Sequence, residues 1–210
     1  MRVIIGANQA ALDAVQKRLT DMGKEGSFSD VLKKAINEVA TAGKNLLYNE
    51  TRSTYTIKAS EFKKGDIVRK GATTRRLIAT LTVKGETPGV RKAYRTRKNS
   101  KRKSAGAMVI KSGAMKELEL KANGKSYKAF LTKMKTGHEG IFQRVPGKYM
   151  KGYSPSGKTK GREAIKEIMA MSKAKAAEMV YEKGNLYTNL QEEISYRLMK
   201  HMNAVIGGTK

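Results

Sequence analysis

Apolar residues recur at helical spacing in several stretches of the chain. Over residues 29–49, Val31, Ala35 and Val39 belong to a wide apolar stripe that repeats every three or four positions. This period is typical of a helix with one buried face, so we expect this helix to pack against a sheet. Three more helices are expected over residues 8–22, 173–182 and 188–205.

Apolar and polar residues alternate in the middle of the chain, over residues 125–132 and 139–145. This period of two is that of a strand half buried in a sheet. Gly137 between the two runs and Gly140 at the start of the second can adopt the positive φ angles of a tight turn, so we predict a hairpin. Further strands are expected over residues 75–84 and 115–121.

The order of these elements predicts a single α+β domain over residues 1–210. Its mainly antiparallel sheet of four or five strands would pack against the helix over 29–49 and against the C-terminal helix. Outside this core we expect two long basic loops, over 87–106 and 146–162, and an N-terminal arm over residues 1–6. Residues 3–5 of the arm would form a short strand or pair elsewhere. The loops are predicted to be mobile in the isolated protein, because they are rich in Lys, Arg, Ser and Gly.

Charge changes this picture, because the 210 residues include 44 Lys and Arg against 18 Asp and Glu, a formal net charge of +26. Such an excess usually marks a polyanionic partner. The two loops contain no acidic residue, so they would either line a groove for a phosphate backbone or order against acidic faces of neighbouring subunits. The candidate DNA- or partner-contacting residues are Arg91, Lys92, Arg95, Arg97, Lys98, Lys101, Arg102, Lys103, Lys148, Lys151, Lys158 and Lys160.

The remaining polar residues do not form a recognisable catalytic or metal-binding pattern. His138 has only Glu139 beside it, and nothing supplies a nucleophile or a metal partner at suitable spacing. The chain has no Cys, which excludes disulfides and thiolate chemistry. No stretch approaches the roughly 20 apolar residues of a membrane span. We therefore expect no enzyme, no cofactor, no metal and no membrane contact.

Two blocks resemble a known family. The run Thr136-Gly137-His138-Glu139-Gly140-Ile141-Phe142 resembles the hallmark hairpin of the phage and prophage minor tail protein Z family. The run Ala164-Ile165-Lys166-Glu167-Ile168 resembles a later strand of that family, with Ala164 where a proline is usual. The resemblance implies a strand over 163–169, although its composition would also allow a helix. The residues that carry the hairpin motif are Phe130, Met134, Gly137, His138, Gly140, Phe142 and Arg144.

The resemblance implies a structural tail protein that acts in tail completion at the head-proximal end of the tail. It would form a homo-oligomeric ring around the DNA path, hexameric as such rings commonly are. Its neighbours would be tail tube, tail terminator or head–tail connector proteins, with genomic DNA as a further contact, in a virion tail assembled in the host cytoplasm. For His138 it favours a turn or interface role. The alternative from charge alone is a free nucleic-acid-binding protein, associated with the ribosome or nucleoid.

Overall fold

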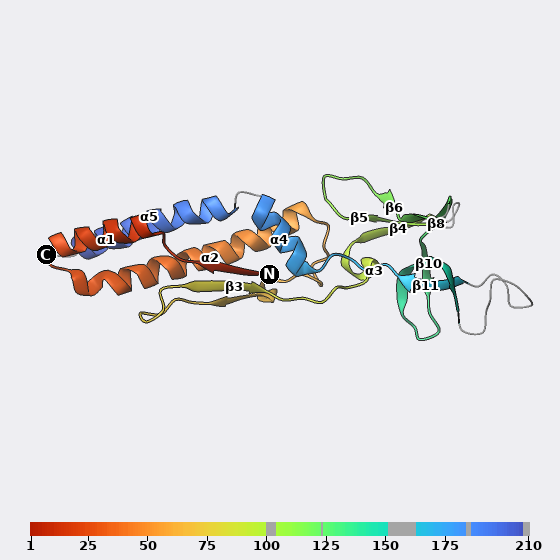
Figure 1. The fold of residues 1–210 in the computed structure, drawn as a ribbon, viewed down its shortest axis with the longest axis horizontal. Helices are drawn as coiled ribbons and strands as arrows, with labels where there is room; N and C mark the ends of the chain where they lie inside the picture. Colours follow the sequence, from red (N-terminus) through yellow and green to blue (C-terminus); the bar gives the residue numbers. More distant parts are fainter. Residues whose placement is uncertain (100–103, 123, 151–162, 184–185, 208–210) are drawn as a thin grey trace, which may run out of the picture. The chain divides into compact units, whose positions relative to one another are not determined.

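The computed structural model describes residues 1–99, 104–122, 124–150, 163–183 and 186–207 (Figure 1). They form an α+β structure, as predicted, with five α-helices and several small antiparallel sheets. The chain divides into two compact units. Unit 1 comprises Met1–Thr51, Lys63–Gly85 and Lys173–Lys210, and unit 2 comprises Arg52–Phe62 and Glu86–Ser172. Whether the two units fold together as the single domain that we expected stays a prediction.

Unit 1 is built around helix α2 (Phe28–Thr54), whose residues from Arg52 on belong to unit 2. Its buried residues include Val31, Ala35 and Val39, the stripe that predicted this helix. Helix α1 (Gln9–Asp21) begins after Asn8, whose side chain accepts a hydrogen bond of 2.8 Å from the Ala11 amide. Helix α5 (Leu186–Gly207) lies beside α1 and completes the helical layer (Figure 1).

An ionic network fixes α5 against α2. Arg197 on α5 donates to Glu38 Oε2 on α2 at 2.9 Å and to Glu193 Oε1 on its own helix at 2.8 Å. His201 Nε2 lies 3.0 Å from Glu38 Oε1. Burial alone would raise the pKa of Glu38, but the hydrogen bond from Arg197 and the close contact with His201 outweigh it and hold that pKa below its ordinary value. Glu38 is therefore an ionised anchor that two residues of α5 share.

The sheet of unit 1 has three antiparallel strands in the order β1-β3-β2. The strands are β1 (Arg2–Ile5), β2 (Ile67–Lys70) and β3 (Ala79–Val83). Val3, Ile5 and Leu81 are buried on one face. The residues that we predicted as an N-terminal arm therefore form an edge strand, because their alternate apolar side chains complete this core. Helix α4 (Lys173–Lys183) joins the unit through an ion pair of 3.0 Å between Lys173 and Asp66.

One side chain of α2 holds the turn between β2 and β3. Asn37 Nδ2 donates to the Ala72 carbonyl at 3.0 Å, and Asn37 Oδ1 accepts from the Ala72 amide at 2.9 Å. Thr73 and Arg76 close the turn with two backbone hydrogen bonds of 2.9 and 3.0 Å. A Cβ at Gly71 would lie 2.6 Å from Asn37 Oδ1, so this close approach requires glycine. The turn explains why the strand predicted over 75–84 is shortened to β3.

Unit 2 contains three small antiparallel sheets, so the described residues do not form the single sheet of four or five strands that we predicted. Their orders are β4-β5-β6, β7-β8 and β11-β10-β9. The strands are β4 (Arg95–Asn99), β5 (Ser104–Met108), β6 (Lys116–Glu117), β7 (Glu119–Ala122), β8 (Lys125–Lys128), β9 (Phe130–Lys133), β10 (Glu139–Tyr149) and β11 (Glu163–Glu167).

The predicted single strand over 125–132 is interrupted at Ala129. This residue is fully buried, its amide donates to the Leu118 carbonyl at 2.7 Å, and its carbonyl accepts from the Ala105 amide at 2.7 Å. The backbone of Ala129 therefore bonds to different partners from those of the residues before and after it. As a result β8 pairs with β7, whereas β9 pairs with β10.

The basic stretch over 87–106 is not the long loop that we predicted. Its described residues form the short helix α3 (Val90–Ala93), the strand β4 and the start of β5. The reason is that Val90, Ala93 and Tyr94 are buried between exposed basic residues. Of the second predicted loop, residues 146–149 complete β10, and residues 151–162 lie outside the described part of the chain.

Replacing Asn37 by Ala is expected to release the β2–β3 turn without unfolding unit 1. Two hydrogen bonds of about 1 kcal/mol each would be lost, so the Ala72 amide should exchange with solvent faster by roughly thirtyfold. Hydrogen exchange followed by NMR measures this. The matched control is Asn45→Ala in the same helix, and equal exchange at Ala72 in both variants would show that Asn37 does not hold the turn.

Candidate interaction site

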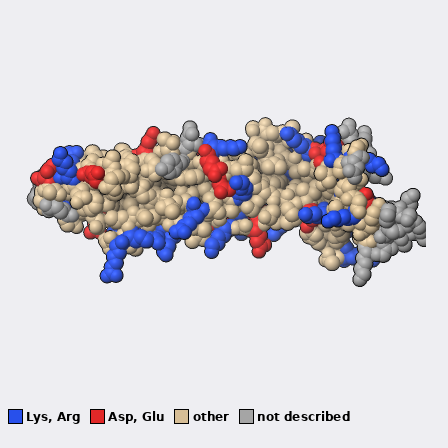
Figure 2. All heavy atoms as spheres, in the orientation of Figure 1, with Lys and Arg blue, Asp and Glu red and all other residues tan. Residues whose placement is uncertain are grey.

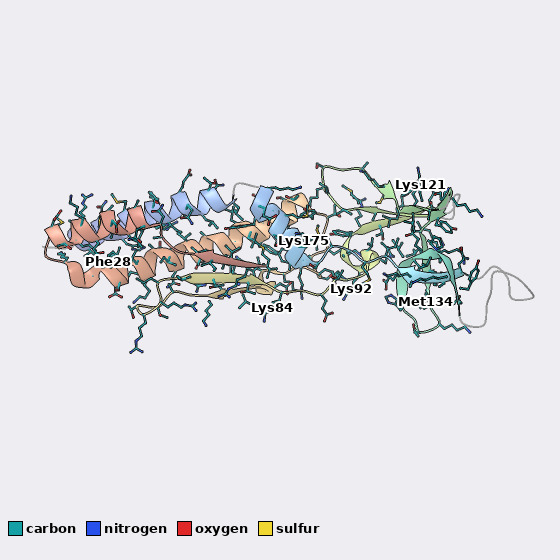
Figure 3. The ribbon with its side chains drawn as sticks, viewed as in Figure 1. Phe28, Lys84, Lys92, Lys121, Met134 and Lys175 are labelled. Carbon is teal, nitrogen blue, oxygen red and sulfur yellow. The ribbon has the colours of Figure 1, made fainter. Side chains whose placement is uncertain are left out.

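The hairpin predicted from the motif is present in unit 2. Strands β9 and β10 pair antiparallel, with Phe130 opposite Phe142 and Thr132 opposite Gly140. At the turn the Met134 amide donates to the His138 carbonyl at 2.8 Å (Met134 is labelled in Figure 3). Gly137 adopts a φ of +86°, a conformation that L side chains rarely adopt. This turn explains the glycine at that position of the motif.

The second block of the resemblance pairs directly with the first. Strand β11 lies antiparallel to β10, with Phe142 opposite Glu167 and Arg144 opposite Ile165 (Figure 1). The strand implied over 163–169 is therefore confirmed in its first five residues, Glu163–Glu167. Two blocks that are separated in sequence form one continuous sheet.

A histidine–carboxylate pair joins the two blocks. His138 Nε2 lies 2.9 Å from Glu167 Oε2, and the His138 ring meets the Phe142 ring edge-on at 6.1 Å between centroids. The side chain of His138 is 53% exposed and that of Glu167 is 24% exposed, so the pair lies at the surface. Sequence reasoning considered only Glu139 as a neighbour of His138. The second block could have indicated this partner from the sequence, because Glu167 is one of its residues.

Two glycines make room for the Glu167 carboxylate. A Cβ at Gly140 would lie 2.7 Å from Glu167 Oε1, and a Cβ at Gly89 would overlap the same oxygen. Gly89 precedes α3, and this segment is tied to the continuation of β11 by a hydrogen bond of 2.9 Å from the Val90 amide to the Ile168 carbonyl. Glu167 therefore lies where the motif hairpin meets the start of the basic segment.

The structure places the twelve candidate basic residues in different settings. Arg91 donates to Thr96 Oγ1 at 2.9 Å and lies 3.6 Å from Glu139 Oε1. Lys92, labelled in Figure 3, lies 3.7 Å from Glu61 Oε1. These two cations are thus partly neutralised within unit 2. The candidates outside the described residues are Lys101, Arg102, Lys103, Lys151, Lys158 and Lys160.

Three of the other candidates form an exposed basic edge, which comprises Arg95, Arg97 and Lys98, and the fourth lies on another sheet. Arg95, Arg97 and Lys98 are exposed on β4, which is an edge strand of its sheet, and Lys148 is exposed near the end of β10. No Asp or Glu among the described residues forms an ion pair with these four side chains. Because side chains alternate along a strand, Arg95 and Arg97 lie on one face of the sheet and Lys98 on the other. Such an edge can attract phosphates or carboxylates.

Tyr94 anchors the start of this edge in the core. It is 1% exposed, and its hydroxyl is buried without a hydrogen-bond partner among the described residues. Burial, together with a smaller effect of the nearby Tyr55, raises the pKa of Tyr94 to about 12. Tyr94 therefore stays neutral over the physiological range and acts as a packing group beside Arg95.

Within the described residues, no cluster of three or more His, Asp or Glu could hold a metal ion. None of the helices in the described part of the chain has the length and apolarity that a membrane crossing needs. Comparison of the chain with models of protein families, with curated proteins and with solved structures gave no match. The resemblance to the minor tail protein Z family accordingly rests on the two blocks themselves.

Replacing Gly140 by Ala is expected to displace the Glu167 carboxylate and to destabilise the protein by about 1–3 kcal/mol. The added methyl group would lie 2.7 Å from Glu167 Oε1 and 2.9 Å from a carbon of the Phe142 ring. Urea denaturation measures the stability, and NMR of the His138 ring reports the broken contact. Gly65→Ala is the control, because nothing lies within 4 Å of that position. If the two variants were equally stable, the methyl group added at position 140 would not crowd Glu167 and Phe142.

Replacing Tyr94 by Phe is expected to leave stability unchanged or slightly higher near neutral pH, because the lost hydroxyl has no partner. The folded-state pKa of Tyr94, about 12, lies above the unfolded value of 10. Its neutral form therefore stabilises the native state fully below pH 10, and this contribution is lost as the pH rises toward 12.

Wild-type protein should consequently lose more stability than Tyr94→Phe above pH 10, by up to roughly 2–3 kcal/mol. Denaturant titrations at several alkaline pH values measure the difference. Tyr196→Phe is the control, because Tyr196 is 63% exposed. A Tyr94→Phe curve parallel to that of the wild type would show that burial of this hydroxyl has no such effect.

Proposed function

We propose that the chain is a structural protein of a phage tail, which acts in tail completion at the head-proximal end as a homo-oligomeric ring around the DNA path. The observation that supports this proposal is the pairing of the two blocks of the resemblance. They form adjacent strands, and His138 of one block lies 2.9 Å from Glu167 of the other.

The charge of the chain gives the proposal a physical mechanism. A net charge of +26 makes each copy repel itself and other copies, so a stable ring needs negative charge from its neighbours. In our proposal the basic edge, formed by Arg95, Arg97 and Lys98, contacts acidic faces of tail tube, tail terminator or connector proteins. A hexameric ring would repeat this edge six times and so bind neighbours with high avidity.

Glu167 has a positioning role in this mechanism. It contacts His138 at the turn of the motif hairpin, and its carboxylate occupies the space left by Gly89, just before α3 and β4. The hairpin is thereby connected to the segment that carries the basic edge. We propose that this connection holds the edge in one orientation for docking, with His138 as an interface or turn residue rather than a catalyst.

Electron microscopy of tails assembled with and without this protein tests the function. Without it, we expect tails of normal tube length that fail to join heads, or that join heads but fail to deliver DNA. Adding back the variant Arg95→Gln/Arg97→Gln/Lys98→Gln should restore fewer complete particles than adding the wild type, because the basic edge is lost. The matched control is Lys17→Gln/Arg18→Gln/Lys200→Gln, which removes the same charge from exposed positions on α1 and α5.

The rival function is a free nucleic-acid-binding protein, and the exposed cations of the basic edge favour it. Tails that are normal without the protein would contradict the tail function. If the purified protein then binds duplex DNA or RNA with an affinity that falls steeply with salt, the rival function is supported instead.

A further inference from the structure

A second basic stretch without acidic residues lies in unit 1, and it contains none of the twelve candidate residues predicted from the sequence. From Ile67 to Gly85 the chain contains no Asp or Glu. The stretch comprises β2, its turn and β3, and we call it the basic hairpin. Figure 2 shows a row of Lys and Arg side chains along this part of unit 1. The cations of the basic hairpin are Arg69, Lys70, Arg75, Arg76 and Lys84.

These charges are not neutralised within the described residues. Lys70, Arg75 and Lys84 are exposed and form no ion pair there (Lys84 is labelled in Figure 3). Arg69 is exposed as well and donates only to a neutral group, the main-chain carbonyl of Asn37, at 3.3 Å. Asp66, just before the hairpin, is already bound by Lys173 at 3.0 Å. The basic hairpin therefore presents uncompensated positive charge to solvent.

The cations are held on a fixed support. Asn37 binds both backbone groups of Ala72, and Thr73 and Arg76 close the turn with two backbone hydrogen bonds. Gly71 allows this close approach to α2. Because the backbone between the cations is already ordered, less conformational entropy is lost when they bind a ligand than for cations on a loop.

We propose that the basic hairpin binds the phosphate backbone of duplex DNA. Two of its four exposed cations, Arg69 and Arg75, are Arg, whose planar fork matches a phosphate group better than a point charge does. The exposed hydroxyls of Thr73 and Thr74 at the turn are further phosphate donors. The stretch has no aromatic residue on which an unpaired base could stack, which favours a duplex over a single strand.

A second copy of this hairpin cannot be the partner, because two acid-free basic surfaces repel each other. The inference rests on the proposed function, in which the chain lies on the DNA path, and it names the surface that meets that DNA. The contact is made to the backbone only, so we expect little sequence preference and a strong dependence on salt.

The experiment measures binding of the full chain to a short fluorescent DNA duplex by anisotropy at stepped KCl concentrations. The variant is Lys70→Gln/Arg75→Gln/Lys84→Gln. If these residues contact phosphates, the slope of log affinity against log salt should become shallower by about 0.9 for each lost contact, or about 2.7 in total. The matched control Lys17→Gln/Arg18→Gln/Lys200→Gln should keep the wild-type slope, although it has the same net charge.

Each other outcome overturns the inference. If the slope of log affinity against log salt became equally shallow in the control variant, only the total charge of the protein would matter. If the slope became shallower only in the variant Arg95→Gln/Arg97→Gln/Lys98→Gln, the DNA contact would be assigned to β4 and not to the basic hairpin. Polyglutamate that binds as tightly as DNA, with the same loss in the hairpin variant, would assign the hairpin to an acidic protein.

Failure of this inference and failure of the proposed function are distinguishable. Absence of duplex binding by the wild type would overturn the inference alone, because the microscopy of tails does not depend on it. Normal tails in the absence of the protein, together with hairpin-dependent duplex binding, would overturn the tail function and leave the phosphate contact in place.

Discussion

The structure depends on where a small number of carboxylates lie. With 18 Asp and Glu against 44 Lys and Arg, repulsion between cations opposes every compact arrangement of this chain. Several of the described carboxylates lie at junctions between elements. Glu38 joins α2 to α5, Asp66 joins the end of the 3₁₀ helix Lys64–Asp66 to α4, and Glu167 joins β11 to the turn of the motif hairpin. Because these carboxylates are bound at junctions, exposed cations such as Arg97, Lys70 and Arg75 form no ion pair within the described residues.

Elements that depend on a few consecutive residues could be predicted from the sequence. The stripe with Val31 and Val39 requires only the helical period, and the motif hairpin requires only alternation and a glycine at Gly137. The division into small sheets could not be predicted, because it depends on distant backbone partners. Ala129 has the same alternation as its neighbours, yet its amide and carbonyl bond to Leu118 and Ala105, which splits one expected strand into two.

The candidate site was only partly predictable for the same reason. His138 was identified, but its partner Glu167 lies 29 residues further on and meets it only through the register of β10 and β11. That register shifts between Arg144 and Tyr149, and no local sequence pattern predicts this irregularity. The space that Gly89 leaves for a carboxylate could not be predicted from the sequence, since that carboxylate comes from β11. Asn37 likewise became meaningful only when the β2–β3 turn was placed against α2.

The wrong prediction of a loop over 87–106 shows why basic composition does not imply disorder. The exposed basic strand β4 is ordered because it pairs along its length with β5, whose small residues Ala105 and Ala107 are buried. The basic hairpin is a similar case, because its backbone is ordered and its cations form no ion pair within the described residues. Cations on an ordered backbone keep a fixed spacing, whereas those on a mobile loop lose entropy each time they bind. A repeating ligand such as a phosphate backbone is therefore better matched by ordered basic strands than by the mobile loops that composition alone suggested.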